Sequence, residues 1–179
     1  MKISKISLYL ALSLVIFGLN VKTVKAQNMD EKLKSLGIEL FEPTKPIANY
    51  VKAVRTGNLI FLSGHGPDEP GKGYVKGKLG KDLTIEEGQR AARLTAISLL
   101  STLKAEIGDL SKVKRIVKVL GMVNCTPDFE DQPKVINGFS DLMVEVFGDK
   151  GRHARSAVGM GSLPSNIAVE IEMIVEVED

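Results

Sequence analysis

The chain has one cysteine, two histidines and no tryptophan, and each scarcity excludes a class of function. Cys125 is the sole thiol, so no intramolecular disulfide can form and stability must come from packing or assembly. A lone cysteine just beyond an apolar strand is more often a small buried hydrophobe than a nucleophile. His65 and His153 stand without metal-ligand spacing, so we expect no metal site. No glycine-rich phosphate loop and no Ser-His-Asp arrangement can be assembled, so we expect no cofactor.

The composition also argues against nucleic-acid binding. Aromatic residues make up 5% of the chain, which leaves few rings to stack on bases. The formal net charge of +2 depends on four lysines of the N-terminal segment, and without them the charge is −2. The one basic run, Lys112 to Lys118, alternates along a predicted strand, which is typical of a solvated edge. We therefore expect no nucleic-acid partner.

Residues 1–26 have the pattern of a signal peptide. Lysines precede an apolar stretch from Leu8 to Leu19, and small residues at Val24 and Ala26 suit cleavage before the next residue. The stretch is shorter than the ~20 residues needed to cross a bilayer, which argues against the alternative of an uncleaved anchor. The sequence therefore predicts an exported protein, periplasmic or secreted, with no membrane attachment after cleavage.

The rest of the chain divides into a polar arm over 27–46 and one domain over 47–179. Two β-rich runs, Tyr50–Arg55 and Leu59–Ser63, flank a Gly-Asn turn and predict a hairpin. The glycine-rich stretch over 64–80 predicts a loop, and loops of this kind often border functional sites.

Two helices are predicted from their ends and their apolar spacing. Thr84 and Glu87 have the spacing of a capping box, and Gly108 ends the helix that they begin. A second helix follows Asp128 or Asp131, either of which can cap it, and its apolar residues recur every three or four positions.

Strands over 113–123, 156–161 and 167–177 complete the order β-β-α-β-α-β-β of an α+β fold. The first of these becomes apolar on both faces toward its end, as in a strand covered on both sides. In the last strand the odd positions are uniformly apolar, whereas the even positions are mixed and include Glu170 and Glu172. Two helices most simply cover one face of a mixed sheet, which leaves the mixed face for a subunit interface.

The C-terminal segment has a distinctive spacing from an arginine to a Leu-Pro pair to a Glu-x-Glu. The residues that carry it are Arg155-Ser156-Ala157-Val158, Leu163-Pro164 and Val169-Glu170-Ile171-Glu172. With this spacing the chain resembles the reactive-intermediate deaminase (RidA/YjgF-like) family. The resemblance implies a chorismate mutase-like fold, a homotrimer, and clefts between subunits that hydrolyse 2-imino or enamine acids to 2-keto acids and ammonia.

The chemistry of a 2-imino acid gives roles to two of these side chains. The Arg155 guanidinium binds a carboxylate through two parallel hydrogen bonds and stays charged at any relevant pH. The Glu170 carboxylate orients a water and accepts its proton, a role worth typically 10²- to 10⁴-fold in rate. Backbone groups near Ser63 and Gly64 can polarise the imine. The resemblance gives these further substrate-binding residues: Tyr50, Ser63, Gly64 and Asn137.

Several departures from the family pattern leave the activity open. Asn49 stands where many members have Pro, His65 where Gln is common and Ala157 where Cys is common, and Gly159 is unusual inside a strand. His65 is a candidate to replace a missing polar group. A trimeric protein that binds small carboxylates without turnover is the alternative, and export favours it because the family's enamines arise in the cytoplasm. An endoribonuclease is disfavoured by the charge.

We predict that the mature protein begins near Gln27 and lies outside the cytoplasm, because the leader pattern ends there. N-terminal sequencing of the native protein checks this. A cytoplasmic protein that retains Met1 would contradict export.

Overall fold

The computed structural model describes residues 28–44 and 48–178, so the predicted leader lies outside the described residues. The helices are α1 (Met29–Ser35), α2 (Ile85–Ile107) and α3 (Gln132–Phe147). The strands are β1 (Ala53–Thr56), β2 (Leu59–His65), β3 (Asp68–Glu69), β4 (Gly73–Tyr74), β5 (Val113–Asn124), β6 (Ala154–Met160) and β7 (Val169–Val177). Short 3-10 turns cover Leu110–Lys112, Gly148–Gly151 and Pro164–Asn166.

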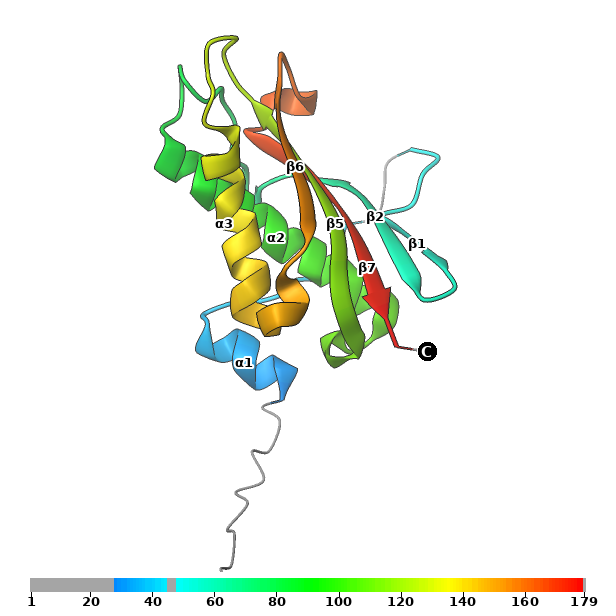
Figure 1. Cartoon of the computed structure of the whole chain (residues 1–179). Helices are drawn as coiled ribbons and strands as arrows, with labels where there is room; N and C mark the ends of the chain where they lie inside the picture. The colour runs from blue at the N-terminus through cyan, green and yellow to red at the C-terminus, as the bar shows by residue number, and fades with distance from the viewer. Residues whose placement is uncertain (1–27, 45–47, 179) are drawn as a thin grey trace, which may run out of the picture.

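Five strands form one mixed sheet in the order β1-β2-β7-β5-β6. Strands β5 and β6 run parallel and are joined through α3, as a parallel pair requires, whereas the other neighbours are antiparallel. Figure 1 shows α2 and α3 side by side against one face of this sheet. The predicted α+β order with two helices on one face is therefore confirmed. The arm contributes a third, short helix, α1, whose Leu33 is buried in the core.

The helix ends follow the local sequence only in part. The side chains of Thr84 and Glu87 form the predicted capping box at the start of α2, and Gly108 ends that helix. Asp131 occupies the N-cap position of α3, but its side chain makes no capping hydrogen bond. Among the described helices none is long and apolar enough to cross a membrane.

The two faces of the sheet have different environments. The odd positions of β7 from Val169 to Val177 are buried against the helices, as the alternation predicts. The even positions of β7, and the residues of β2 and β5 that pair with them, lie on the other face, which none of the described helices covers (Figure 1). That face is partly apolar, with Phe61 41% and Val158 40% exposed and with Leu120 half-buried. The predicted covering of β5 on both faces is therefore absent within a single chain.

The long loop after β2 is tied to the end of the sheet rather than left free. Strands β3 and β4 form a small hairpin within it, and Lys76 then bridges to Ile167 just before β7. Asn124, which is fully buried at the end of β5, donates through Nδ2 to the carbonyl oxygens of Gly77 and Ile167. The loop is therefore fixed in place by backbone acceptors on two segments.

Helices α2 and α3 approach most closely at Gly138. A Cβ atom there would overlap the backbone carbonyl oxygen of Gln89, which cannot rotate away. The absence of a side chain at this position therefore sets how closely the two helices can pack.

We predict that Gly138→Ala lowers the free energy of unfolding by about 1–3 kcal/mol, the usual effect of overpacking, although alanine favours helix intrinsically. Gly161→Ala is the control, because a Cβ atom there meets nothing within 4 Å. Urea unfolding of both variants measures the difference. A Gly138→Ala variant as stable as wild type would mean that the helices separate without cost.

Candidate functional site

Arg155 lies on the helix-covered face of the edge strand β6. It pairs with Val119 of β5, a fully buried core residue, so its side chain points to the same side as the core. Its Nη1 donates to Asn137 Oδ1 at 3.0 Å and to Ser140 Oγ at 3.0 Å. Its Nη2 donates to the carbonyl oxygen of Pro133 at 3.5 Å. Helix α3 thus holds the guanidinium, and Arg155 and Asn137 are brought together.

A histidine supports this arginine through Ser140. His153 Nδ1 lies 2.7 Å from the carbonyl oxygen of Gly151, and its Nε2 lies 3.1 Å from Ser140 Oγ. Because a carbonyl only accepts, Nδ1 carries the proton, and Nε2 accepts from the Ser140 hydroxyl, which in turn accepts from Arg155. Burial, and then the charge of Arg155, lower the pKa of His153. The histidine is therefore held neutral beside the guanidinium.

Glu170 lies on the open face of the sheet, near the start of the central strand β7. It pairs with Met122 of β5, and its carboxylate packs directly over Gly64 of β2, where any Cβ atom would overlap Glu170 Oε1. Burial, and then the charge of Glu172, raise the pKa of Glu170. A carboxylate of raised pKa is a better proton acceptor, which suits a general base.

Arg155 and Glu170 are on opposite faces of the same sheet. In the registers that pair β6 with β5 and β5 with β7, Arg155 aligns with Val119, whereas Glu170 aligns with Met122. Those two β5 residues differ by an odd number of positions, so they point to opposite sides of the sheet. One small substrate cannot contact both side chains within a single chain.

Of the remaining candidates, Ser63 and Gly64 lie in β2, and Tyr50 lies before β1. Tyr50, Gly64 and His65 line a cavity of about 180 Å³. The N–H of Ser63 donates to the Lys52 carbonyl oxygen at 3.0 Å, so this group is not available to polarise an imine. The structure therefore brings Gly64 next to Glu170, whereas Tyr50 lines a cavity to which Glu170 does not contribute.

His65 has a structural role in this region. Its ring is 5% exposed, with Nδ1 2.7 Å from the Ser63 carbonyl oxygen and Nε2 2.8 Å from Thr102 Oγ1. Burial lowers the pKa of His65. Because both ring nitrogens have partners, His65 does not supply a free polar group to the site. Within residues 28–44 and 48–178 no cluster of three His, Cys, Asp or Glu side chains could hold a metal ion.

Comparison with known proteins places this arrangement in a family. A model of the family described as "YjgF/chorismate_mutase-like, putative endoribonuclease" matches residues 30–177. The chain belongs to this YjgF-like family. Its α+β sheet and helices have the YjgF/chorismate mutase-like fold.

Three similar proteins span most of the chain. Protein TCP17 of Trypanosoma cruzi is 42% identical over 89% of this chain and 100% of its own length. The 2-iminobutanoate/2-iminopropanoate deaminase of Dermatophagoides farinae is 32% identical over 75% of this chain and 90% of its own. The crystal structure of Atu1372 from Agrobacterium tumefaciens, a protein with unknown function, is 46% identical, with a TM-score of 0.79 over 84% of this chain and 92% of its own.

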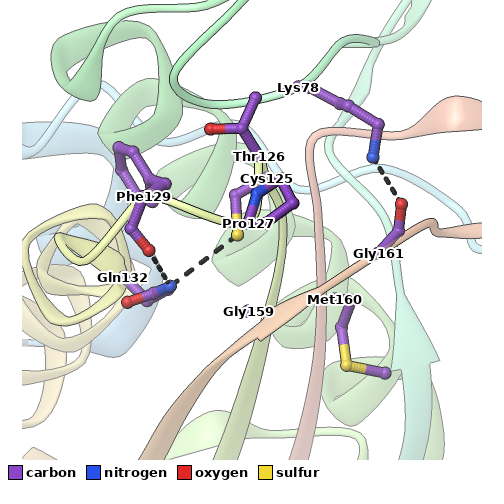
Figure 2. A pocket seen from close by; sticks show the side chains of 9 residues that line it. All are labelled: Lys78, Cys125, Thr126, Pro127, Phe129, Gln132, Gly159, Met160 and Gly161. Carbon is purple, nitrogen blue, oxygen red and sulfur yellow. Dashed lines mark hydrogen bonds between the residues drawn. The ribbon is translucent and has the colours of Figure 1, made fainter.

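A further cavity in the described part of this YjgF-like chain is not lined by any of the six candidates. It has a volume of about 560 Å³ and lies where β5 and β6 end and α3 begins (Figure 2). Its walls come from Lys78, Cys125 and the residues after it, Gln132 and the end of β6. Sequence reasoning missed it, because three segments far apart in the chain form it. Two features of the sequence could have pointed to this cavity: Gly159, which is unusual inside a strand, and Cys125, the sole cysteine.

We predict that Glu170→Gln raises the melting temperature at pH 7. The folded-state pKa of Glu170 is raised, so the ionised carboxylate disfavours folding above that pKa, and the penalty disappears below the unfolded-state value of about 4.5. The gain should therefore shrink as the pH falls toward 4.5. Thermal melts of both proteins between pH 4 and pH 8 measure it.

Glu172→Gln is the matched variant, because Glu172 is the charge that raises the pKa of Glu170. Carbon-13 NMR titration should give a lower pKa for Glu170 in that variant. A Glu170→Gln protein that melts below wild type at pH 7 would show instead that the carboxylate stabilises the fold.

Proposed function

We propose that this protein hydrolyses 2-imino or enamine acids to 2-keto acids and ammonia, at sites shared between neighbouring copies of a homotrimer. The observation that carries the proposal is the placement of Arg155 and Glu170 on opposite faces of one sheet. Both residue types suit the reaction, yet a single chain cannot bring them to one substrate. A second copy that lays its Glu170 face near Arg155 completes the site.

Arg155 anchors the substrate carboxylate. Its Nη1 is saturated by Asn137 and Ser140, and one Nη2 proton reaches the Pro133 carbonyl oxygen. Among the described residues no acceptor takes the Nε proton or the second Nη2 proton. These two form the edge of the guanidinium that binds a carboxylate with two parallel hydrogen bonds. The contacts from α3 fix the plane of the guanidinium before substrate arrives.

Glu170 supplies the base. A water oriented by its carboxylate attacks the imine carbon, and Glu170 takes a proton from that water as the C–O bond forms. The proton then passes to the nitrogen, which gives a carbinolamine. Glu170 next takes the hydroxyl proton of the carbinolamine and returns it to the amine as the C=O bond forms and the C–N bond breaks, so ammonia leaves and the keto acid remains. The raised pKa of Glu170 favours the first transfer, and the absence of a side chain at the adjacent Gly64 leaves room for the carboxylate itself.

Assembly would also cover the open face of the sheet. Phe61, Leu120, Val158 and Ile174 lie on this face at least partly exposed. Exposed apolar surface of this kind marks protein interfaces, and closed rings are common among homo-oligomers. A homotrimer with this face inward places Glu170 and Glu172 at the interface, where further burial strengthens the base.

The Dermatophagoides farinae relative named as a 2-iminobutanoate/2-iminopropanoate deaminase supports the choice of reaction. A periplasmic or secreted location remains part of the proposal, since it rests on the leader pattern alone. Binding of small carboxylates without turnover is the second candidate, favoured by Ala157 in the place of the family's common cysteine. Measured imine hydrolysis separates the two.

We predict that Arg155→Lys and Glu170→Gln each lose activity as pure proteins but restore it when mixed. Arg155→Lys should lower carboxylate affinity roughly 10- to 100-fold, since it loses the planar fork. Glu170→Gln should lower kcat and leave keto-acid binding intact. Trimers that form at random when equal amounts of the two variants are refolded together should recover about a quarter of the wild-type kcat/KM. Each trimer that contains both variants has one intact site of three.

The control for this experiment is the double variant refolded with an equal amount of wild type. A shared site needs two neighbouring wild-type subunits, so the activity should fall to about a quarter, below the half that dilution alone would leave. Light scattering must also give a trimer for each pure protein. If the mixed trimers recover almost no activity, Arg155 and Glu170 do not act together at one shared site. A strictly monomeric protein would also overturn the shared site.

A further inference from the structure

The 560 Å³ cavity beside Cys125 has the size and lining of a small-molecule site. Such sites measure roughly 300–1,000 Å³ and combine apolar walls with a few placed polar groups. Here Pro127, Phe129 and Met160 supply apolar surface, and Lys78 and Gln132 supply polar atoms. None of the six residues given to the proposed deaminase site lines the cavity, so the cavity is independent of that function.

Lys78 is the one cation that lines the cavity, and it is held in place. Figure 2 shows its side chain crossing from the loop before α2 to the carbonyl oxygen of Gly161 beyond β6. Its Nζ also donates to Asn124 Oδ1 at 2.8 Å. An ammonium group has three donors, so one remains. No salt bridge among the described residues involves Lys78, so its charge has no carboxylate partner within the described part of the chain.

The wall opposite Lys78 includes Gln132, whose side-chain amide nitrogen already donates to groups within the chain. Gln132 Nε2 donates to the Phe129 carbonyl oxygen at 2.6 Å and to Cys125 Sγ at 3.7 Å. A Cβ atom at Gly159 would come within 2.8 Å of both Cys125 Sγ and Gln132 Nε2. The glycine in the strand therefore allows these two side chains to pack against β6, and the rest of the space stays open.

We propose that this cavity binds a small apolar monocarboxylate. The carboxylate accepts the remaining donor of Lys78, and the apolar part lies among Pro127, Phe129 and Met160. A single free donor and a single lining cation match one negative charge better than the two of a phosphate monoester. The apolar walls favour a hydrocarbon or aromatic body over a sugar or a polar amino acid.

Phenylacetate and its neutral isostere phenylacetamide test the charge requirement by calorimetry on the full-length mature protein. We expect the acid to bind about tenfold or more tightly than the amide, since only the acid makes a charge-assisted hydrogen bond. Equal affinities, or no saturable binding of either compound, would overturn the proposal. Inorganic phosphate should not compete.

Two variants separate the two ends of the ligand. Lys78→Met should remove the preference for the acid over the amide, whereas Phe129→Ala should weaken both compounds by a similar factor and keep the preference. Circular dichroism checks that each variant is folded. If Lys78→Met does not fold, the proposal is still tested by the preference of the wild type for the acid over the amide and by the effect of Phe129→Ala on both compounds.

Cys125 reports where the ligand sits. It is the sole cysteine of the chain and lines the cavity, so its alkylation by iodoacetamide is an unambiguous signal. Phenylacetate should slow this alkylation with the same Kd that calorimetry gives. Protection should persist in Arg155→Lys, whereas its loss there would place the ligand on Arg155 and refute this site without touching the deaminase proposal.

Discussion

The sheet has helices on one face only, and this asymmetry decides where every candidate residue can act. A strand sends successive side chains to opposite sides, so a residue's parity fixes whether it faces α2 and α3 or the open side. Arg155 falls on the helix side, where Asn137 and Ser140 hold its guanidinium. Glu170 falls on the open side over Gly64. The two faces cannot cooperate within one chain, which is why the proposed chemistry requires a second copy.

The same asymmetry creates a conflict between stability and chemistry at Glu170. Its carboxylate is half-buried next to Glu172, and both features disfavour the charged form. A residue selected for stability alone would be neutral or paired there, and no described basic side chain forms a salt bridge with Glu170. Groups that cost stability and gain basicity are common at functional sites. The raised pKa is therefore better explained by function than by folding.

Features that depend on local or periodic sequence were predictable. The capping box of Thr84 and Glu87 and the alternation of β7 both rest on contacts within a few residues or on one repeating pattern. The pairing of Arg155 with Asn137 came from the family resemblance. It depends on α3 crossing β6, which spacing alone does not show.

Features that depend on tertiary contacts were not predictable. His65 was a candidate for the site, yet Thr102, 37 residues away on α2, occupies its second nitrogen. The support of Arg155 by His153 through Ser140 needs three elements to meet, so no motif reveals it. Of the backbone groups expected near Ser63 and Gly64, the Ser63 N–H already donates to the carbonyl oxygen of Lys52, just before β1, and this contact also depends on two segments meeting.

Two of the departures from the family pattern, Ala157 and Gly159, lie on β6. Both are small residues, and at Gly159 a Cβ atom would overlap the side chains of Cys125 and Gln132. Because Gly159 has no side chain, Cys125 and Gln132 pack directly on the strand, and the loop that carries Lys78 closes the far side. The loop can do so because the buried Asn124 binds both its backbone and its lysine. The absence of a side chain at Gly159 thus lets residues from distant segments meet at the edge of the cavity, on the same sheet that positions Arg155.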